Sequence, residues 1–248
     1  MLLQQGTFSC CIDNRPGHLV NKRNSGQIWP LVGIHLGNVG LDIKFCKGER
    51  MATFFSSLHK TLMAGLVLLV AIVVLFGLTS GQWVRPDYAW FAFVMRWLHV
   101  LSGIMWIGVL YYFNFVQTPT MPKIEPADHR AAITKFILPE ALFWFRWAAA
   151  STVLTGLLVA WMNGYLVNAL LLHKGHVAIG IGMWLALVMA FNVWFVIWPN
   201  QKKVIGLVEA SAEEKAVAGR IAGMTSRINT MLSIPMLYFM VAQQNAGL

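Results

Sequence analysis

The stretch from Arg96 to Pro119 reads RWLHVLSGIMWIGVLYYFNFVQTP. It is long and apolar enough to cross a bilayer as a helix, since about 20 apolar residues span the hydrocarbon. At about 100° per residue, Arg96, His99, Gly103 and Asn114 fall on one face of this helix. An ionisable side chain inside a membrane helix is costly without a partner. His99 is therefore the first candidate for a functional site.

Composition places the chain among integral membrane proteins. Hydrophobic residues make up 57% of the 248 residues, charged residues only 12%, and the mean hydropathy is +0.60. Soluble domains carry about 25% charged residues, so this balance excludes a soluble class. The net charge of +9 does not indicate a nucleic-acid partner, because the basic residues lie between apolar spans rather than on one amphipathic face.

Apolar stretches predict an all-α integral membrane protein, a bundle of about five transmembrane helices within residues 51–248. The expected spans are 60–79, 90–116, 141–162, 176–198 and a weaker one at 229–243. Before the last span, segment 204–223 has the pattern of an amphipathic helix that lies along the cytoplasmic surface.

Basic residues predict the orientation in the membrane. The loops 117–140 and 199–228 are rich in lysine and arginine, whereas the alternate loops carry only Arg85 and Lys174. By the positive-inside rule, both rich loops face the cytoplasm of a bacterial inner membrane, with the N-terminus inside and the C-terminus outside. Arg146 is expected to snorkel to the cytoplasmic headgroups.

Residues 1–50 do not share this pattern. They contain all three cysteines and show neither a helical nor an alternating apolar period. We expect a disordered upstream extension of the reading frame with Met51 as the natural start; a genuine cytoplasmic tail is the alternative. The sequence has no CxxCH motif, so no covalently attached c-type haem is expected in this chain.

Two histidines predict a b-type haem between the second and fourth spans. His99 and His176 lie at similar depth in the outer half of the membrane, as possible ligands of the iron. Imidazoles are usual axial ligands of haem. Each histidine is followed by a glycine on its own face, Gly103 and Gly180, where a porphyrin could approach the backbone.

Neighbouring residues would complete such a site. His173 lies one turn before His176 and is a further cofactor-binding candidate. Arg96, with Lys174, would stand at the outer edge and neutralise the haem propionates. No paired carboxylates lie within the spans, so any oxidation would depend on a cofactor, and catalytic residues are not identified.

A structural interpretation of the same residues stays open. His99 can be a histidine that is hydrogen-bonded to a neighbouring helix, and His173 and His176 lie near the interface, where polar residues cost little. The glycines can be notches for helix packing. The chain would then be a non-catalytic membrane protein, such as an assembly factor or a small transporter.

Three segments together resemble a known family. They are RWLHVLSGIMWIGVLYYFNFVQTP (96–119), NVWFVIWPNQKKVIG (192–206) and RINTMLSIPMLYFM (227–240). They are similar to the membrane domain of the bacterial, cytochrome-c-linked urate hydroxylases of the PuuD type, the urate oxidase N-terminal domain family. The resemblance implies membrane-bound oxidation of urate to 5-hydroxyisourate.

The resemblance also assigns positions and partners. Arg96, His99 and Trp106 match the motif of the family's second helix, and the turn after its fourth helix is matched by Asn200, Lys202 and Lys203. After Met240 the chain reads VAQQNAGL, where longer members place a histidine and further domains. We therefore expect a separate cytochrome c or a quinone as the electron acceptor. A homo-oligomer is left open.

Overall fold

The computed structural model describes residues 54–245, whose regular structure is all helical. This confirms the predicted all-α class. The chain divides into two compact units, one ending at Leu66 and the other beginning at Val67. The expectation for residues 1–50 lies outside the described residues.

Helix α2 (Leu58–Ser80) crosses the division between the two units. In the first unit, the Thr61 hydroxyl donates a hydrogen bond to the Ser57 carbonyl at the start of this helix (3.1 Å). In the second unit, the Trp83 side chain lies against Gly77 of this helix, where an added Cβ would be 2.7 Å from Cε3 of the indole.

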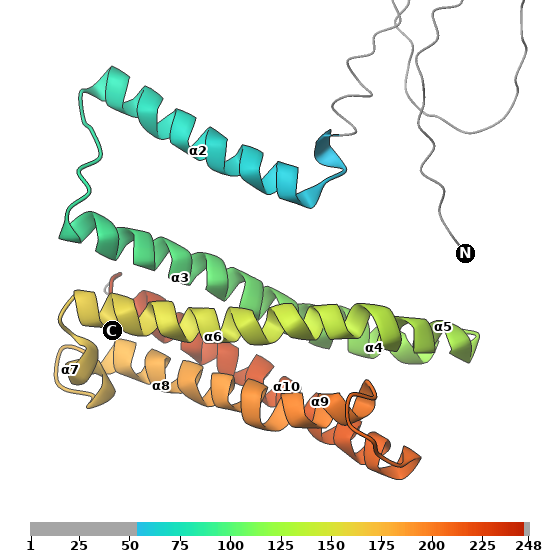
Figure 1. Ribbon diagram of the computed structural model, residues 1–248. Coiled ribbons are helices and arrows are strands. Elements are labelled where there is room, and N and C mark those ends of the chain that lie inside the picture. Colours follow the sequence, from blue (N-terminus) through green and yellow to red (C-terminus); the bar gives the residue numbers. More distant parts are fainter. Residues whose placement is uncertain (1–53, 246–248) are drawn as a thin grey trace, which may run out of the picture. The chain divides into compact units, whose positions relative to one another are not determined.

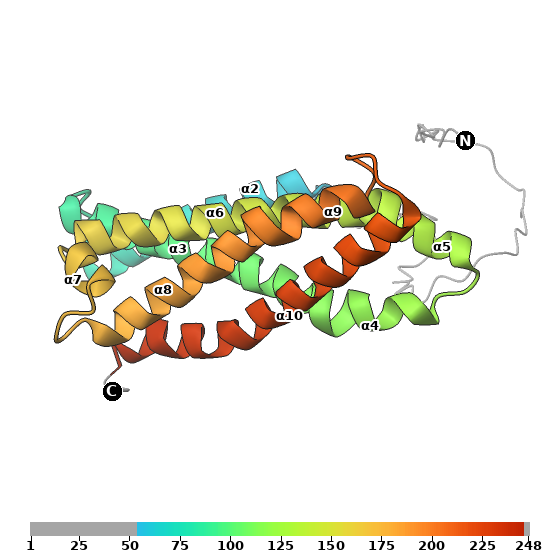
Figure 2. The ribbon, with the colours of Figure 1, turned by 90° about the horizontal axis from the view of Figure 1, so that it is seen from below.

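The second unit is built around four long helices that run side by side. Helix α3 packs along α6, α6 contacts α8, α8 packs along α10, and α10 contacts α3 (Figures 1 and 2). The short helix α7 lies at one end, and α4, α5 and α9 lie towards the other. The bounds are α3 (Tyr88–Tyr111), α4 (Thr118–Thr120), α5 (Ala127–Ala132), α6 (Leu138–Met162), α7 (Leu166–Leu170), α8 (Val177–Phe191), α9 (Trp198–Val204) and α10 (Ala212–Ala242).

Among the described residues, four helical stretches are long and apolar enough to cross a membrane. They are Leu58–Ser80, Tyr88–Lys123, Asp128–Met162 and Val177–Val204. The first three contain the spans predicted at 60–79, 90–116 and 141–162, and the fourth covers all but the first residue of 176–198. Tyr88–Lys123 and Asp128–Met162 are much longer than predicted, Val177–Val204 is slightly longer, and most of the expected loop 117–140 is helical.

These helices continue past three prolines because a wider, π-helical turn precedes each proline. Three π-helical segments, η1 (Tyr112–Gln117), η3 (Ile133–Ile137) and η4 (Asn192–Ile197), each stand directly before a residue followed by proline. In each case the residue before the proline donates its N–H to a carbonyl five positions back, as from Trp198 to Val193. Proline lacks an N–H and clashes with the preceding turn. The wider turn lets the helix continue past it.

The predicted amphipathic helix at 204–223 is wrong in its bounds. Helix α9 ends at Val204, and a turn follows in which Gly206 has a φ of +81°. Helix α10 then runs from Ala212 to Ala242, through all but the last residue of the weak span 229–243. The reason is a capping box at Ser211. Its hydroxyl accepts a bond from the Glu214 N–H (3.2 Å), and the Glu214 carboxylate accepts one from the Ser211 N–H (2.7 Å).

Replacing Ser211 by alanine is expected to lower the free energy of unfolding by about 1 kcal/mol, because one N–H of the first turn loses its acceptor. Chemical unfolding followed by circular dichroism measures the loss. Glu213→Gln, in the same turn but outside the capping box, is the matched control and should change little. An equal loss in both variants would contradict the role of the capping box.

The same capping box makes the helix end sensitive to acid. Hydrogen bonds from the Ser211 N–H and hydroxyl lower the pKa of Glu214 below its ordinary value of 4.5. A lowered pKa in the folded state means that this stabilisation is present above the ordinary value and is lost as the pH falls through the lowered one.

Candidate functional site

His99 projects from α3 onto α6. Its Nδ1 lies 2.8 Å from the backbone carbonyl oxygen of Thr152, and the Thr155 hydroxyl is 3.4 Å from the same nitrogen. A carbonyl can only accept, so Nδ1 carries the hydrogen, and in the neutral ring Nε2 keeps its lone pair. This is the arrangement in which histidines bind metals, with the second nitrogen donating to a carbonyl.

Gly156 makes room for this ring. A Cβ at Gly156 would lie 2.8 Å from Cε1 and 3.0 Å from Nδ1 of His99. Gly103, the predicted approach surface for a porphyrin, has its Cβ position 3.9 Å from Cγ2 of Thr152 in α6. Sequence reasoning missed Gly156. The sequence does show that Gly156 lies four residues after Thr152. This spacing places the Thr152 carbonyl and the space left by the missing Gly156 side chain on one face of α6.

His176 stands directly before α8, as its N-cap residue. Its ring stacks on that of Tyr165, with centroids 5.9 Å apart and planes at 21°. His173 is exposed, and its Nδ1 lies 3.1 Å from Oδ1 of Asn168. Lys174 is exposed as well. The two histidines therefore lie in and beside the connection from α7 to α8.

Tyr165 brings Arg96 and His176 into one neighbourhood. Burial raises the pKa of the Tyr165 hydroxyl, and the positive charge of Arg96 acts in the opposite direction. Nε of Arg96 is buried and has no hydrogen-bond partner in the described part of the chain. One end of the bundle thus collects Arg96, with His99 one turn further along α3, Tyr165 and His176. No motif in the sequence marks Tyr165 as a site residue.

His99 and Gly180 differ in what they could offer a haem. The place in front of Gly180 is filled by protein, because a Cβ there would overlap the Ala169 carbonyl oxygen and lie 2.6 Å from Cδ2 of Leu172. The donor chemistry of His99 does suit an axial ligand. Across residues 54–245, no three His, Cys, Asp or Glu side chains gather as a site for a metal ion.

Further along the bundle, buried polar side chains join α10 to its neighbours. Asn229 is fully buried; its Nδ2 donates to the Met189 carbonyl (3.0 Å), and its Oδ1 accepts from Asn192 (2.8 Å). Ser233, also fully buried, lies 3.0 Å from the Tyr111 hydroxyl. The polar atoms of these side chains form hydrogen bonds with groups on neighbouring helices. They therefore hold the helices together rather than line a polar pathway.

The other positions assigned by the resemblance lie in the core and in α9. Trp106 is fully buried, and its Nε1 finds no hydrogen-bond partner within the residues that the structure describes. Asn200 donates to the Val196 carbonyl (2.8 Å), which helps α9 continue after the π-helical turn. Lys202 reaches the ring of Trp198, with Nζ 5.9 Å from its centroid.

Comparison with known proteins gives one match. Residues 162–246 fit the family described as urate oxidase N-terminal. This confirms the resemblance predicted from the sequence and covers two of its three segments, 192–206 and 227–240. The match includes Tyr165 and His176 and does not extend to Arg96 and His99. No curated protein and no solved structure matches the chain.

Proposed function

We propose that this chain is a membrane-embedded redox protein related to the membrane domains of urate hydroxylases. Two observations support the class: the family match at residues 162–246 and the four helices able to cross a membrane. We place it in a bacterial inner membrane with its N-terminus in the cytoplasm, on the distribution of basic residues. The Arg96 end of the bundle would then face outwards.

The observation that carries the proposed site is the orientation of His99. The Thr152 carbonyl holds the ring by Nδ1, so that Nε2 would be the atom that binds the iron of a b-type haem. Such a haem would supply one-electron transfer when bound. His176 is the proposed opposite ligand, with His173 as the second choice.

Arg96 is the proposed contact for an anion at this end. Its buried Nε lacks a hydrogen-bond partner in the described chain, and its positive charge acts to lower the pKa of the Tyr165 hydroxyl. It could neutralise a propionate or bind urate, a planar anion. Oxidation of urate to 5-hydroxyisourate adds the oxygen of one water and releases two electrons and two protons. The proposed acceptor is a separate cytochrome c or a quinone.

Replacing His99 by alanine is expected to abolish the Soret band of the purified protein and the consumption of urate by membranes that contain it. Gly156→Ala should reduce both, because the new methyl group displaces the imidazole ring. Gly108→Ala is the matched control, since nothing lies within 4 Å of its Cβ position. Absorption spectra and urate assays measure the effects. An unchanged Soret band in His99→Ala would refute the proposed ligand.

The second candidate is a non-catalytic membrane protein. It is favoured by the His99–Thr152 bond, which makes His99 an ordinary structural contact between α3 and α6, and by the filled space at Gly180. Under this alternative, the wild-type protein has no Soret band, and His99→Ala lowers only its thermal stability. The spectrum of the unaltered protein therefore separates the two functions.

A further inference from the structure

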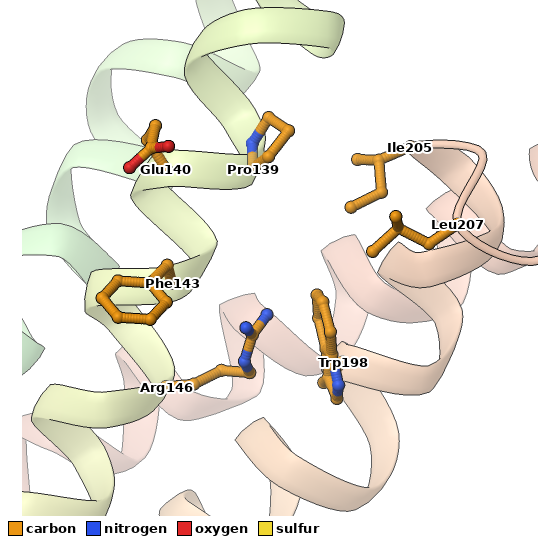
Figure 3. Close-up of a pocket in the computed structure, with 7 residues that line it drawn as sticks. All are labelled: Pro139, Glu140, Phe143, Arg146, Trp198, Ile205 and Leu207. Atoms are coloured by element: carbon orange, nitrogen blue, oxygen red, sulfur yellow. The ribbon is translucent and has the colours of Figure 1, made fainter.

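A pocket of about 450 Å³ lies between α6, α9 and the turn after α9 (Figure 3). It is at the opposite end of α6 from Met162 and the Tyr165 turn. Its lining is largely apolar, from Pro139, Phe143, Ile205 and Leu207, together with Arg146 and Trp198.

Arg146 brings a positive charge to this pocket. Its guanidinium lies over the Trp198 ring, with Cζ 3.2 Å from the ring centroid. Its Nη1 is buried and has no hydrogen-bond partner in the part of the chain that the structure describes. Glu140 also lines the pocket, but it makes no hydrogen bond to Nη1. An oxygen of a bound ligand could supply the acceptor that Nη1 lacks within the described chain.

A second cation lies close by. Nζ of Lys202 is 5.9 Å from the centroid of the same Trp198 ring, so the indole has two positive charges near it. The exposed carboxylate of Glu140 offsets one of them. Two positive charges and one negative charge leave the pocket with a net positive charge, which favours a ligand with at least one negative charge.

An exposed aromatic surface continues from the pocket. Phe143 packs against Trp144 and Trp147, with centroids 5.7 and 6.4 Å apart, and Trp147 packs against Trp194. Trp144 and Trp147 are each 53% exposed. In a membrane, lipid chains would cover such a surface.

We propose that this pocket binds an anionic phospholipid, with the phosphate on Arg146 and the acyl chains along the aromatic surface. Guanidinium groups pair well with phosphate oxygens, and basic pockets between membrane helices take anionic headgroups. The combination of a phosphate-binding cation with a continuous apolar surface selects a lipid over a free oxyanion. The lipid site does not depend on the proposed redox function.

The test measures lipid binding to the purified full-length chain in detergent by native mass spectrometry. Phosphatidylglycerol should bind several-fold more tightly than phosphatidylcholine, and Arg146→Gln should weaken phosphatidylglycerol binding about tenfold. Arg146→Lys should keep part of the affinity. Arg220→Gln, an equal loss of charge at an exposed position of α10, is the matched control and should bind as the unaltered protein does.

Several results would overturn the proposal. Equal binding of both lipids would refute the proposed lipid site. Unchanged phosphatidylglycerol binding by Arg146→Gln would refute it as well. Displacement of phosphatidylglycerol by millimolar inorganic phosphate would indicate a site for free oxyanions, and displacement by urate would assign the pocket to the substrate. Circular dichroism checks that Arg146→Gln is folded. If it is not, Lys202→Gln provides the test, with a several-fold loss expected and an unchanged affinity counting against the lipid site.

Discussion

Alanine at position 180 is expected to lower the free energy of unfolding by about 3 kcal/mol, because overpacking against backbone leaves no cheap relaxation. The added Cβ would overlap the carbonyl oxygen of Ala169 in α7 and lie 3.1 Å from the carbonyl carbon of the same residue. Ala169 is itself fully buried, so α7 cannot shift without disturbing its own packing.

Unfolding of the purified protein in detergent by a chemical denaturant, followed by circular dichroism, measures the effect of Gly180→Ala. Gly108→Ala is the control; nothing lies within 4 Å of its Cβ position, and alanine has the higher helix propensity, so stability should be equal or slightly higher. A second variant tests the cause. Adding Leu172→Ala to Gly180→Ala removes the side-chain clash but not the carbonyl, so it should not restore stability. Full rescue would contradict the backbone clash.

Asn229→Ala is expected to cost about 2 kcal/mol, from a cavity and from lost hydrogen bonds between helices. Asn229 is fully buried, donates to the Met189 carbonyl and accepts from Asn192. Without it, the Asn192 amide loses its acceptor. Helix α10 then loses a polar attachment to α8 and to the π-helical segment that follows it.

A double-mutant cycle isolates the pair. Asn229→Ala, Asn192→Ala and the double variant should show a coupling energy of about 1 kcal/mol, within the range for hydrogen bonds between membrane helices. Asn245→Ala, at an exposed position beyond the end of α10, is the control. Strict additivity of Asn229→Ala and Asn192→Ala would mean that the two amides do not stabilise the fold together.

Long helices could be predicted from the sequence, but their ends could not. The apolar runs identify the four strong spans because hydropathy is a local property of each segment. The extensions through Pro119, Pro139 and Pro199 were missed, since proline ordinarily ends a helix and nothing local shows that a wider turn will accommodate it. The start of α10 was recoverable from Ser211 and Glu214, whose spacing is that of a capping box.

The candidate site was predicted only in part. His99 was identified because a histidine in an apolar helix is unusual. The sequence left two roles open for it, a haem ligand or a hydrogen bond to a neighbouring helix. The identity of that partner, Thr152, depends on how α3 is rotated against α6, as does the fit of the ring on Gly156. Tyr165 has no motif that marks it, so its stacking with His176 emerges only from the packed structure.

The sequence by itself determined the all-helical class, the positions of four helices long and apolar enough to cross a membrane, and the family resemblance, because composition, hydropathy and short motifs are carried by neighbouring residues. Only the tertiary structure decided what each polar side chain meets. It set His99 against the Thr152 carbonyl, filled the space at Gly180 with α7 and laid Arg146 over Trp198. Such contacts depend on the rotation and spacing of helices far apart in the chain. The hydropathy of an individual span does not encode them.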